Sequence, residues 1–186
     1  MRIEEIENSK KIILHLCADI GSDSKPYRDA GYDVRCIGRE IDVRRYKPMG
    51  GVYGIIANPP CTHLAGSGAR WWKIKGDSAL LEALSIVDAC TRIILLCQPN
   101  FWMIENPVGR LVHYLGKPKL IYNPCDYGDP YTKKTCVWGR FNIPIKNPVF
   151  PTLGSMMHKL PPSPDRAEKR SICSPGFAKA FFEVNQ

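Results

Sequence analysis

The chain has 186 residues, of which 44% are hydrophobic and 24% charged, a composition typical of one soluble globular domain. No apolar run approaches the roughly 20 residues of a membrane span, and residues 1–5 lack a signal peptide's apolar core. The eight cysteines include no Cys-x-x-Cys pair, which argues against a zinc ribbon or a thioredoxin motif. We therefore expect a cytoplasmic protein with reduced thiols, no membrane anchor and no bound metal.

The net charge of +8 is concentrated in two parts of the chain. Residues 131–170 hold eight Lys or Arg residues against two acids, and residues 66–76 interleave three cations with two tryptophans. Cations that neutralise phosphates, beside rings that stack on bases, are typical of nucleic-acid binding. A solvated basic surface above two core tryptophans would look the same. In the second segment, Arg70 and Trp71 are candidate substrate contacts.

The first part of the chain has the pattern strand, turn, helix, strand. Residues 11–17 form an apolar run that predicts a strand buried on both faces. A turn of small residues follows, and residues 26–30 predict a short helix that ends at Gly31. Residues 32–38 predict a second strand, and the acids at its end could accept hydrogen bonds from ribose hydroxyls. This is the first half of a nucleotide-type binding unit, although Gly-x-Gly-x-x-Gly itself is absent.

A third strand leads into the stretch that the chain is organised around. Residues 51–56 predict a buried strand, which Pro59 and Pro60 end because they fix φ and remove two backbone donors. Cys61 is therefore presented at the carboxyl end of a strand, where open α/β sheets bind ligands. We expect the basic loop that follows, residues 62–76, to lower the pKa of this thiol and to act as a mobile lid.

The second half of the chain continues the alternation of strands and helices. A helix capped by Asp77 or Ser78 is expected to run to about Cys97, and residues 101–104 predict a strand that ends in Glu105. Further expected segments are strands at 118–122 and 135–139, a turn-rich loop at 123–130, an irregular segment at 142–163 and a helix at about 176–184. The alternation predicts one α/β domain over residues 1–186 with a mostly parallel sheet. Cys61 and Glu105, at the ends of two strands, form a candidate nucleophile and acid pair.

Four short motifs follow one another along the chain. They are Asn58-Pro59-Pro60-Cys61, Glu105-Asn106-Pro107, residues 126–135 and residues 171–180. In that order they resemble the Pro-Cys, Glu-Asn-Val, Tyr-Gly-x-Pro-Gln-x-Arg-x-Arg and closing Asn-Ser-Val-Pro-Pro-x-x-Ala-x-Ala motifs of the S-adenosylmethionine-dependent cytosine-C5 DNA methyltransferases. The resemblance spans nearly the whole chain. It implies a Rossmann-like methyltransferase fold, with a mostly parallel central sheet and helices on both faces.

The resemblance implies a covalent mechanism at cytosine. The thiolate of Cys61 would add to carbon 6 of the pyrimidine, so that carbon 5 takes the methyl group from the sulfonium; a base then removes the carbon 5 proton and the thiol leaves. Glu105 would hydrogen-bond the ring nitrogen and exocyclic amine, and Lys133 the base or its phosphate. Lys134 and Thr135, in the same motif, are further implied substrate contacts. A base in a duplex must first be flipped out of the stack, unless the DNA is single-stranded already.

The resemblance also implies S-adenosyl-L-methionine as the cofactor. Leu16–Gly21 matches the family's Phe-x-Gly-x-Gly turn loosely, with an aspartate in place of one glycine, whereas Glu40 matches the ribose-binding acid well. The implied cofactor-binding residues are Cys17, Asp19, Gly21, Glu40, Asn58, Pro60 and Ser174.

Three departures from the family pattern bear on the ligands. The second arginine of the basic motif is replaced by Thr135, and Gly54 stands where an acid often contacts adenine. Only about 30 residues, 141–170, separate the last two motifs. Full enzymes carry a large target-recognition domain there, so we interpret this segment as a short irregular insert in its place. Without that domain a sequence-specific reading of duplex DNA is difficult, which suits a minimal catalytic core.

Other interpretations stay open at this stage. Asn58-Pro59-Pro60 also begins the Asn-Pro-Pro-aromatic motif of adenine amino-methyltransferases, but a cysteine follows here and Glu105 would have no role. The expected partner is DNA, including single-stranded DNA, yet C5 methylation of a free pyrimidine nucleotide would also suit a chain without a recognition domain. A non-catalytic nucleic-acid-binding remnant would explain the loose first turn. The oligomeric state stays open.

Overall fold

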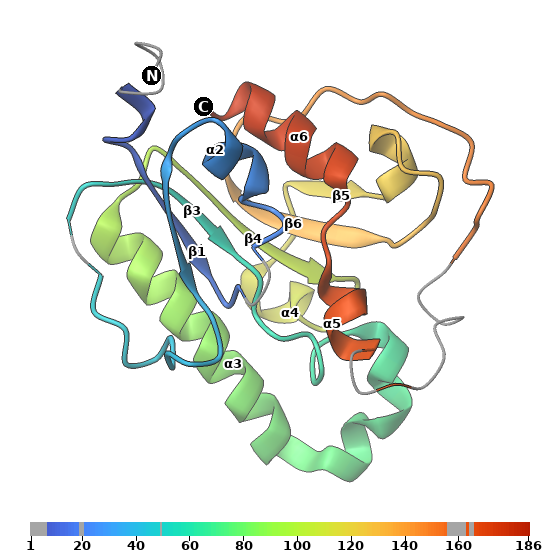
Figure 1. Cartoon of the computed structure of the whole chain (residues 1–186). Coiled ribbons are helices and arrows are strands. Elements are labelled where there is room, and N and C mark those ends of the chain that lie inside the picture. The colour runs from blue at the N-terminus through green and yellow to red at the C-terminus, as the bar shows by residue number, and fades with distance from the viewer. Residues whose placement is uncertain (1–6, 19–20, 49, 156–162, 164–165) are drawn as a thin grey trace.

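A computed structural model describes residues 7–18, 21–48, 50–155, 163 and 166–186 of the chain. Its strands are β1 (Ile12–Leu16), β2 (Asp33–Ile37), β3 (Val52–Ala57), β4 (Phe101–Pro107), β5 (Leu120–Tyr122) and β6 (Thr135–Arg140). Its helices are α2 (Lys25–Asp29), α3 (Trp72–Cys97), α4 (Val112–Leu115), α5 (Arg166–Ser171) and α6 (Pro175–Val184), with short 3-10 helices η1 (Gly66–Trp71) and η2 (Pro124–Tyr127). The strands form one sheet with helices around it (Figure 1).

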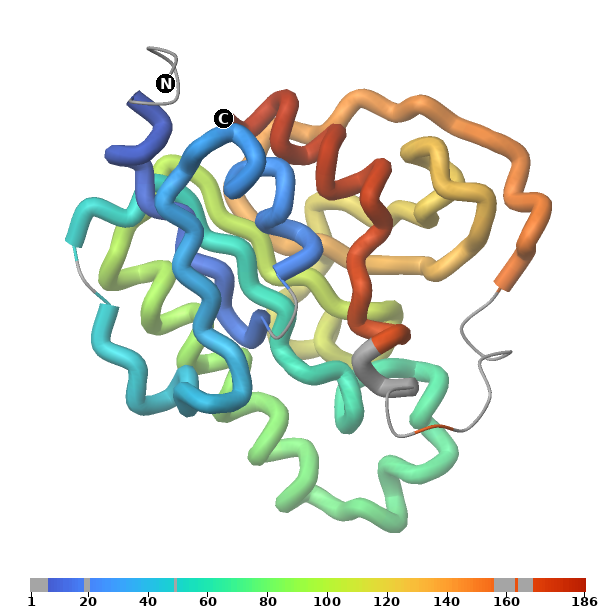
Figure 2. The backbone as a smooth tube through the Cα atoms, in the orientation of Figure 1, coloured from blue at the N-terminus to red at the C-terminus, as the bar shows by residue number. Residues whose placement is uncertain are grey.

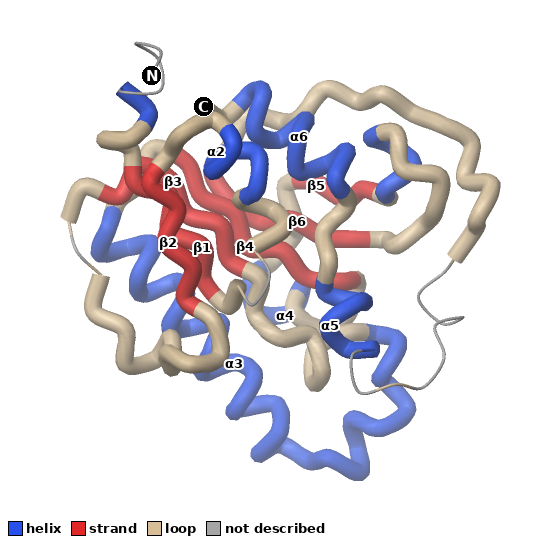
Figure 3. Tube along the Cα trace, in the orientation of Figure 1, coloured by secondary structure: helices blue, strands red, loops and turns tan. Residues whose placement is uncertain are grey.

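The order of strands in the sheet is β2-β1-β3-β4-β6-β5. Neighbours from β2 to β4 are parallel, whereas β6 runs antiparallel to both β4 and β5. The expected α/β fold with a mostly parallel sheet is therefore confirmed, and Figure 3 shows the strands of the sheet in red among the blue helices. From β1 the chain goes first to β2 on one side and then to β3 on the other. The strand order therefore reverses between β1 and β3, and ligands of open α/β sheets bind outside the carboxyl ends of the strands at such a point.

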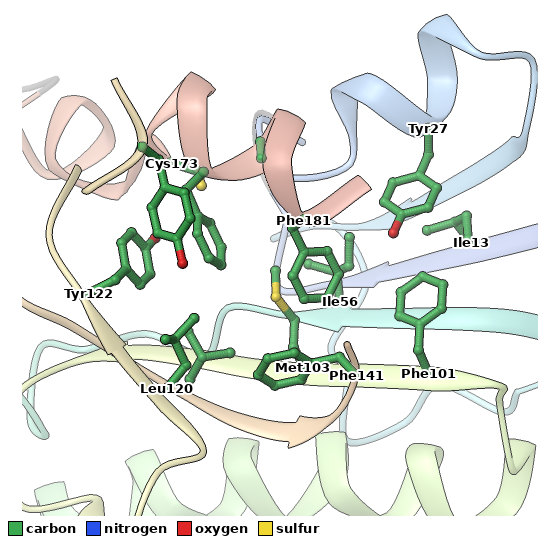
Figure 4. Close-up of a cluster of buried hydrophobic side chains, with 14 of the residues drawn as sticks. Ile13, Tyr27, Ile56, Phe101, Met103, Leu120, Tyr122, Phe141, Cys173 and Phe181 are labelled. Carbon is green, nitrogen blue, oxygen red and sulfur yellow. The ribbon is translucent and has the colours of Figure 1, made fainter. Parts of the chain in front are cut away.

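Helices cover both faces of the sheet, as expected. The backbone trace shows α2 and α6 on one face and α3 on the other (Figures 1 and 2). Because side chains alternate along a strand, Ile13 and Ile56 pack with Tyr27 and Phe181 beneath α2 and α6 (Figure 4). Their neighbours in the strands pack against α3 instead; this second cluster includes Leu14, Ile55, Ile93 and Ile104. Burial of each such side chain contributes about 1.5–3 kcal/mol.

The segment expected as a loop, residues 62–76, is partly helical. It contains η1 and the first turn of α3, so that α3 begins at Trp72 rather than at Asp77. Tertiary contacts explain the difference: Ala65 pairs with Gly109 in a β-bridge, and the guanidinium of Arg110 lies 4.5 Å from the Trp72 ring centroid. Gly76 has φ 70° and interrupts the helix just before Asp77. A lid motion of this segment stays a prediction.

The other helices and strands differ less from their predicted boundaries. β4 continues past Ile104 to Pro107, so that Glu105 lies within the strand, opposite Val137 of β6. The short helices α4 and α5 were not expected. Residues 141–150 have no helix or strand, as predicted, and residues 156–162 of the irregular segment lie outside the described residues. In the part of the chain that is described, no helix has the length and hydropathy to cross a membrane.

Candidate active site

A cavity of about 1080 Å³ opens at the point where the strand order reverses. Residues at the carboxyl ends of three strands line it: Cys17 and Ala18 after β1, Gly38 after β2, and Asn58, Pro60 and Cys61 after β3. Ligand cavities typically measure about 300–1,000 Å³, so this one can accommodate a nucleoside-sized ligand with a second group beside it. The place expected from strand order and the place of the predicted nucleophile thus coincide.

The turn that carries Cys61 is held by two consecutive residues of β4. Asn58 Nδ2 donates a hydrogen bond to Glu105 Oε2 at 3.2 Å, and Asn106 Nδ2 donates to the Pro59 carbonyl at 2.7 Å. Neighbouring side chains of a strand point to opposite faces of the sheet, so Glu105 and Asn106 bind the turn from opposite faces. The two predicted reactive residues are thereby brought to one end of the sheet.

Cys61 is the most accessible thiol of the protein. All eight cysteines lie among the described residues and are free thiols. Cys61 is exposed, whereas the other seven are buried or half-buried. Surrounding atoms nevertheless desolvate the sulfur, which raises the pKa of Cys61, and the charge of Glu105 raises it further. Lys133 and Arg170 oppose these two effects without outweighing them. The expectation that residues 62–76 lower the thiol pKa is therefore wrong, because the cations that act on it belong to other segments.

Burial also raises the pKa of Glu105. Desolvation is the largest cause, and the charge of Asp23 adds to it. Lys133 and the hydrogen bond from Asn58 act in the opposite direction. A carboxyl group of raised pKa keeps its proton to higher pH, which suits a group that must donate a hydrogen bond to a ring nitrogen.

The three basic-motif residues occupy different environments. Lys133 Nζ donates to the carbonyls of Arg170 at 2.8 Å and Ile172 at 3.3 Å, and so attaches the end of α5 to the site. Thr135 is buried and donates to the Lys133 carbonyl at 2.9 Å. Lys134 is exposed. The hydroxyl of Thr135 is therefore used within the protein.

The predicted cofactor residues divide into those at the cavity and those away from it. Cys17, Gly21, Asn58 and Pro60 line the cavity, and Asp19 lies outside the described residues. Gly21 has φ 68° and Cys17 has φ 58°, so the backbone turns sharply where β1 ends. This turn forms one wall of the cavity.

Two predicted cofactor residues are not among those that line the cavity. Glu40 is exposed, and Asp42 lies at the cavity wall in its place. Hydrogen bonds from Arg44, whose guanidinium is 2.8 Å from the Asp42 carboxylate, lower the pKa of Asp42 to about 2. Ser174 is buried, accepts a hydrogen bond from Phe177 N at 3.2 Å as the cap of α6, and donates to Asp129.

The aromatic-basic segment reaches the same cavity. Arg70 and Trp71 of η1 both line it, with the guanidinium of Arg70 lying 5.1 Å from the Trp71 ring centroid. Trp71 is 46% exposed, so much of its ring is available for stacking. The two candidate substrate contacts therefore line the same cavity as Cys61.

Three further side chains at the site, those of His15, Asp23 and Arg170, were not predicted. His15 is 1% exposed and joins Ser24 to Asn58 through its two ring nitrogens. Asp23 is buried, and its Oδ1 atom has no hydrogen-bond partner among the described residues. Arg170 lines the cavity. The sequence held a signal for His15 alone, since a histidine inside an apolar, fully buried strand needs a partner for each nitrogen.

Comparisons with known proteins support the fold. The sequence matches no protein-family model and no curated protein. Among solved structures, it is similar to a candidate DNA modification methyltransferase encoded within an E. coli prophage, with 18% identity and a TM-score of 0.50. The match covers 75% of this chain and 53% of that one, so the chain spans about half of that protein's length. The chain therefore has a methyltransferase-like, Rossmann-like α/β fold.

Within the described residues, no group of three or more His, Cys, Asp or Glu side chains is placed to hold a metal ion.

Proposed function

We propose that this protein is a cytosine-C5 methyltransferase that acts on DNA through a covalent adduct at Cys61, with residues 1–186 forming one catalytic domain. The observation that carries the proposal is the hydrogen bond from Asn58 to Glu105, which joins the cavity-lining turn of the exposed Cys61 thiol to a half-buried acid on β4. The methyltransferase-like fold and the order of the sequence motifs support it.

The cavity suits S-adenosylmethionine, which would supply an electrophilic methyl group when bound. Its wall includes the turn after β1 and the carboxylate of Asp42 after β2. It also includes Asp23, a buried carboxylate with one unpartnered oxygen, which could accept a hydrogen bond from the ammonium group of an amino acid. Cys17, Gly21 and Pro60 would hold the cofactor by shape and backbone contacts.

The residues of the site divide the work of the reaction. The Cys61 sulfur adds to carbon 6 of the pyrimidine, and Glu105 holds a proton at the ring nitrogen so that charge does not build up there. Protonated Glu105 no longer repels the thiolate electrostatically, which removes one of the two causes that raise the pKa of Cys61. Lys133 and Arg170 then stabilise the thiolate. After methylation, loss of the carbon 5 proton to a base expels the thiol.

The alternative adenine amino-methyltransferase loses support. That chemistry needs an asparagine side chain free to hold the target amine, but Asn58 Oδ1 accepts from His15 and Asn58 Nδ2 donates to Glu105. Both functional groups of this amide are engaged inside the protein. A short segment at 141–170 in place of a recognition domain suits a single-stranded substrate, which Arg70 and Trp71 would contact.

A substrate panel tests the proposal. The protein is incubated with S-adenosylmethionine labelled in the methyl group and with single-stranded DNA, duplex DNA, RNA or dCMP, and the products are digested to nucleosides. We expect 5-methylcytosine from DNA, whereas N6-methyladenine would overturn the proposal. 5-Methylcytosine from dCMP alone would reassign the substrate to a free nucleotide.

An adduct experiment tests the nucleophile. DNA that contains 5-fluorocytosine retains its carbon 5 fluorine, so it should trap the enzyme as a covalent complex visible by denaturing electrophoresis. Cys61→Ser should abolish the complex, and Cys97→Ser, a change of a half-buried cysteine at the end of α3, should preserve it. A complex that survives Cys61→Ser would show that another group attacks the base.

A further inference from the structure

A continuous set of hydrogen bonds runs behind the proposed acid. His15 of β1 lies 2.8 Å from Ser24 Oγ through Nδ1 and 2.6 Å from Asn58 Oδ1 through Nε2. Asn58 in turn contacts Glu105 at 3.2 Å. β1 and β3 are adjacent and parallel, with His15 opposite Ile56, so a side chain of β1 can reach the turn after β3. Side chains from separate segments of the protein are thus linked by one series of hydrogen bonds.

The chemistry of the partners determines who donates. A carbonyl oxygen can only accept, so the 2.6 Å contact requires the proton of His15 to be on Nε2. The hydroxyl of Ser24 can then donate to Nδ1 at 2.8 Å, a shorter contact than its alternative to the Gly21 carbonyl at 3.2 Å. Each nitrogen of the buried imidazole is paired in this arrangement, as burial demands.

The same logic determines the orientation of the Asn58 amide. With Oδ1 accepting from His15, the NH2 group faces Glu105 Oε2. If the amide turned over, its oxygen would face the carboxylate oxygen and a hydrogen bond would become a repulsion. His15 therefore selects the orientation in which Asn58 can hold Glu105.

We propose that His15 is a positioning residue: through Asn58 it keeps Oε2 of Glu105 as an acceptor and leaves Oε1 as the oxygen that holds the proton for the target ring. This inference rests on the proposed function. It assigns a role to a histidine that neither the motifs nor the comparisons identify, and the role acts on the rate of the chemical step.

Variants of His15 test the proposal in single-turnover methyl transfer. His15→Leu should lower the rate about tenfold, the effect of losing one orienting hydrogen bond, while the KM for DNA stays unchanged. His15→Gln should restore most of the rate, because its amide NH can replace the Nε2–H donor. Ile13→Val is the matched control, a packing change on the same face of β1, and should keep the wild-type rate.

A double-variant comparison tests whether His15 acts through Asn58. In an Asn58→Leu background, adding His15→Leu should cause no further loss, because the side chain that transmits the effect is already gone. Losses that multiply in the double variant would overturn the inference. A His15→Leu variant with the wild-type rate, or a His15→Gln variant no better than His15→Leu, would do so as well.

Nitrogen NMR of the wild-type protein gives a test that does not depend on how the variants fold. We expect a proton on Nε2 of His15, and a bare Nε2 would contradict the proposed orientation. Failure of the proposed function looks different: the wild-type protein would then make no 5-methylcytosine from any substrate, whatever the state of His15.

Discussion

Cys61 and Glu105 both ionise less readily in this site than in water, and desolvation is the main cause for each. The positive charge of Lys133 acts on both groups and favours their charged forms. One cation thus acts on the proposed nucleophile and on the proposed acid. The residue-scale consequences can be measured on the free protein, without substrate.

Glu105→Gln should stabilise the protein at neutral pH. The folded-state pKa of Glu105 lies above the ordinary value of a glutamate, about 4.5, so the stability linked to its protonation is complete below about pH 4.5 and is lost as pH rises through the folded value. Glutamine stays neutral and can still accept from Asn58. Thermal unfolding should give a higher Tm than wild type at pH 7.5 and an equal Tm at pH 4. The exposed Glu40→Gln serves as control, and an equal gain at both pH values would contradict the electrostatic cause.

Removal of either cation near the thiol should make Cys61 less reactive. Lys133→Met and Arg170→Gln each remove a charge that lowers the pKa of Cys61, so the thiolate fraction should fall at a given pH. Iodoacetamide alkylation at pH 8, followed by peptide mass spectrometry, should slow several-fold at Cys61. Lys134→Met removes an exposed neighbouring charge and should leave the rate unchanged. Equal slowing in all three variants would point to a long-range effect.

The segment after β3, which follows Cys61, packs closely against the segment after β4. The segment after β4 runs so close to the segment after Cys61 that a Cβ atom added at Gly109 would lie 2.0 Å from the Leu64 carbonyl oxygen. Gly66 N also donates to the Val108 carbonyl at 2.8 Å, and Arg110 Nε donates to the His63 carbonyl at 2.8 Å. This contact keeps the thiol turn in register with the strand that carries Glu105.

Gly109→Ala should therefore destabilise the protein by about 1–3 kcal/mol, because the neighbouring backbone has to move. The adduct yield with 5-fluorocytosine DNA should fall as well, since the displaced backbone leads back to Cys61. Gly50→Ala is the matched control: no atom lies within 4 Å of the added Cβ, so its effect should stay within about 0.5 kcal/mol. Denaturant unfolding measures both, and a Gly109→Ala protein as stable as Gly50→Ala would show that the contact is loose.

For the molecule as a whole, the proposed binding of nucleic acid should depend on salt, because the net charge is +8. Four exposed cations belong to the two segments proposed to contact DNA, residues 66–76 and the basic motif, and we call these segments the DNA path: Arg70, Lys73, Lys75 and Lys134. If each neutralises one phosphate of single-stranded DNA at about 0.7 per contact, the slope of log K against log salt should be about −3. Fluorescence anisotropy between about 50 and 200 mM salt measures this slope.

Single substitutions then test which residues contact the DNA. Arg70→Ala should make the slope less negative by about 0.7, whereas Lys179→Ala on α6, where the lysine lies 3.9 Å from Glu183, should not change it. Trp71→Ala should weaken binding at every salt concentration by about 1–3 kcal/mol through lost stacking, with little change in slope. Equal effects of Arg70→Ala and Lys179→Ala would mean that the whole surface, and not this path, binds DNA.

The sequence alone determined the main strands, the mostly parallel sheet and the position of Cys61 at the end of a strand. Hydrophobic runs, two prolines and a few glycines act within a few residues of themselves, so the apolar runs at 11–17, 51–56 and 101–104 predicted the strands observed at 12–16, 52–57 and 101–107. Since strands that alternate with helices form parallel sheets, the placing of the thiol at a carboxyl edge followed from the same local signals.

Only the tertiary structure decided what surrounds that thiol. The contacts from His15 to Asn58 and from Asn58 to Glu105 span 43 and 47 residues, and Arg170 reaches the cavity from α5. The helical form of η1 and the raised pKa of Cys61 likewise depend on groups remote in sequence. Burial and hydrogen bonding between distant segments exist only once the sheet has formed, and for that physical reason no local pattern could reveal them.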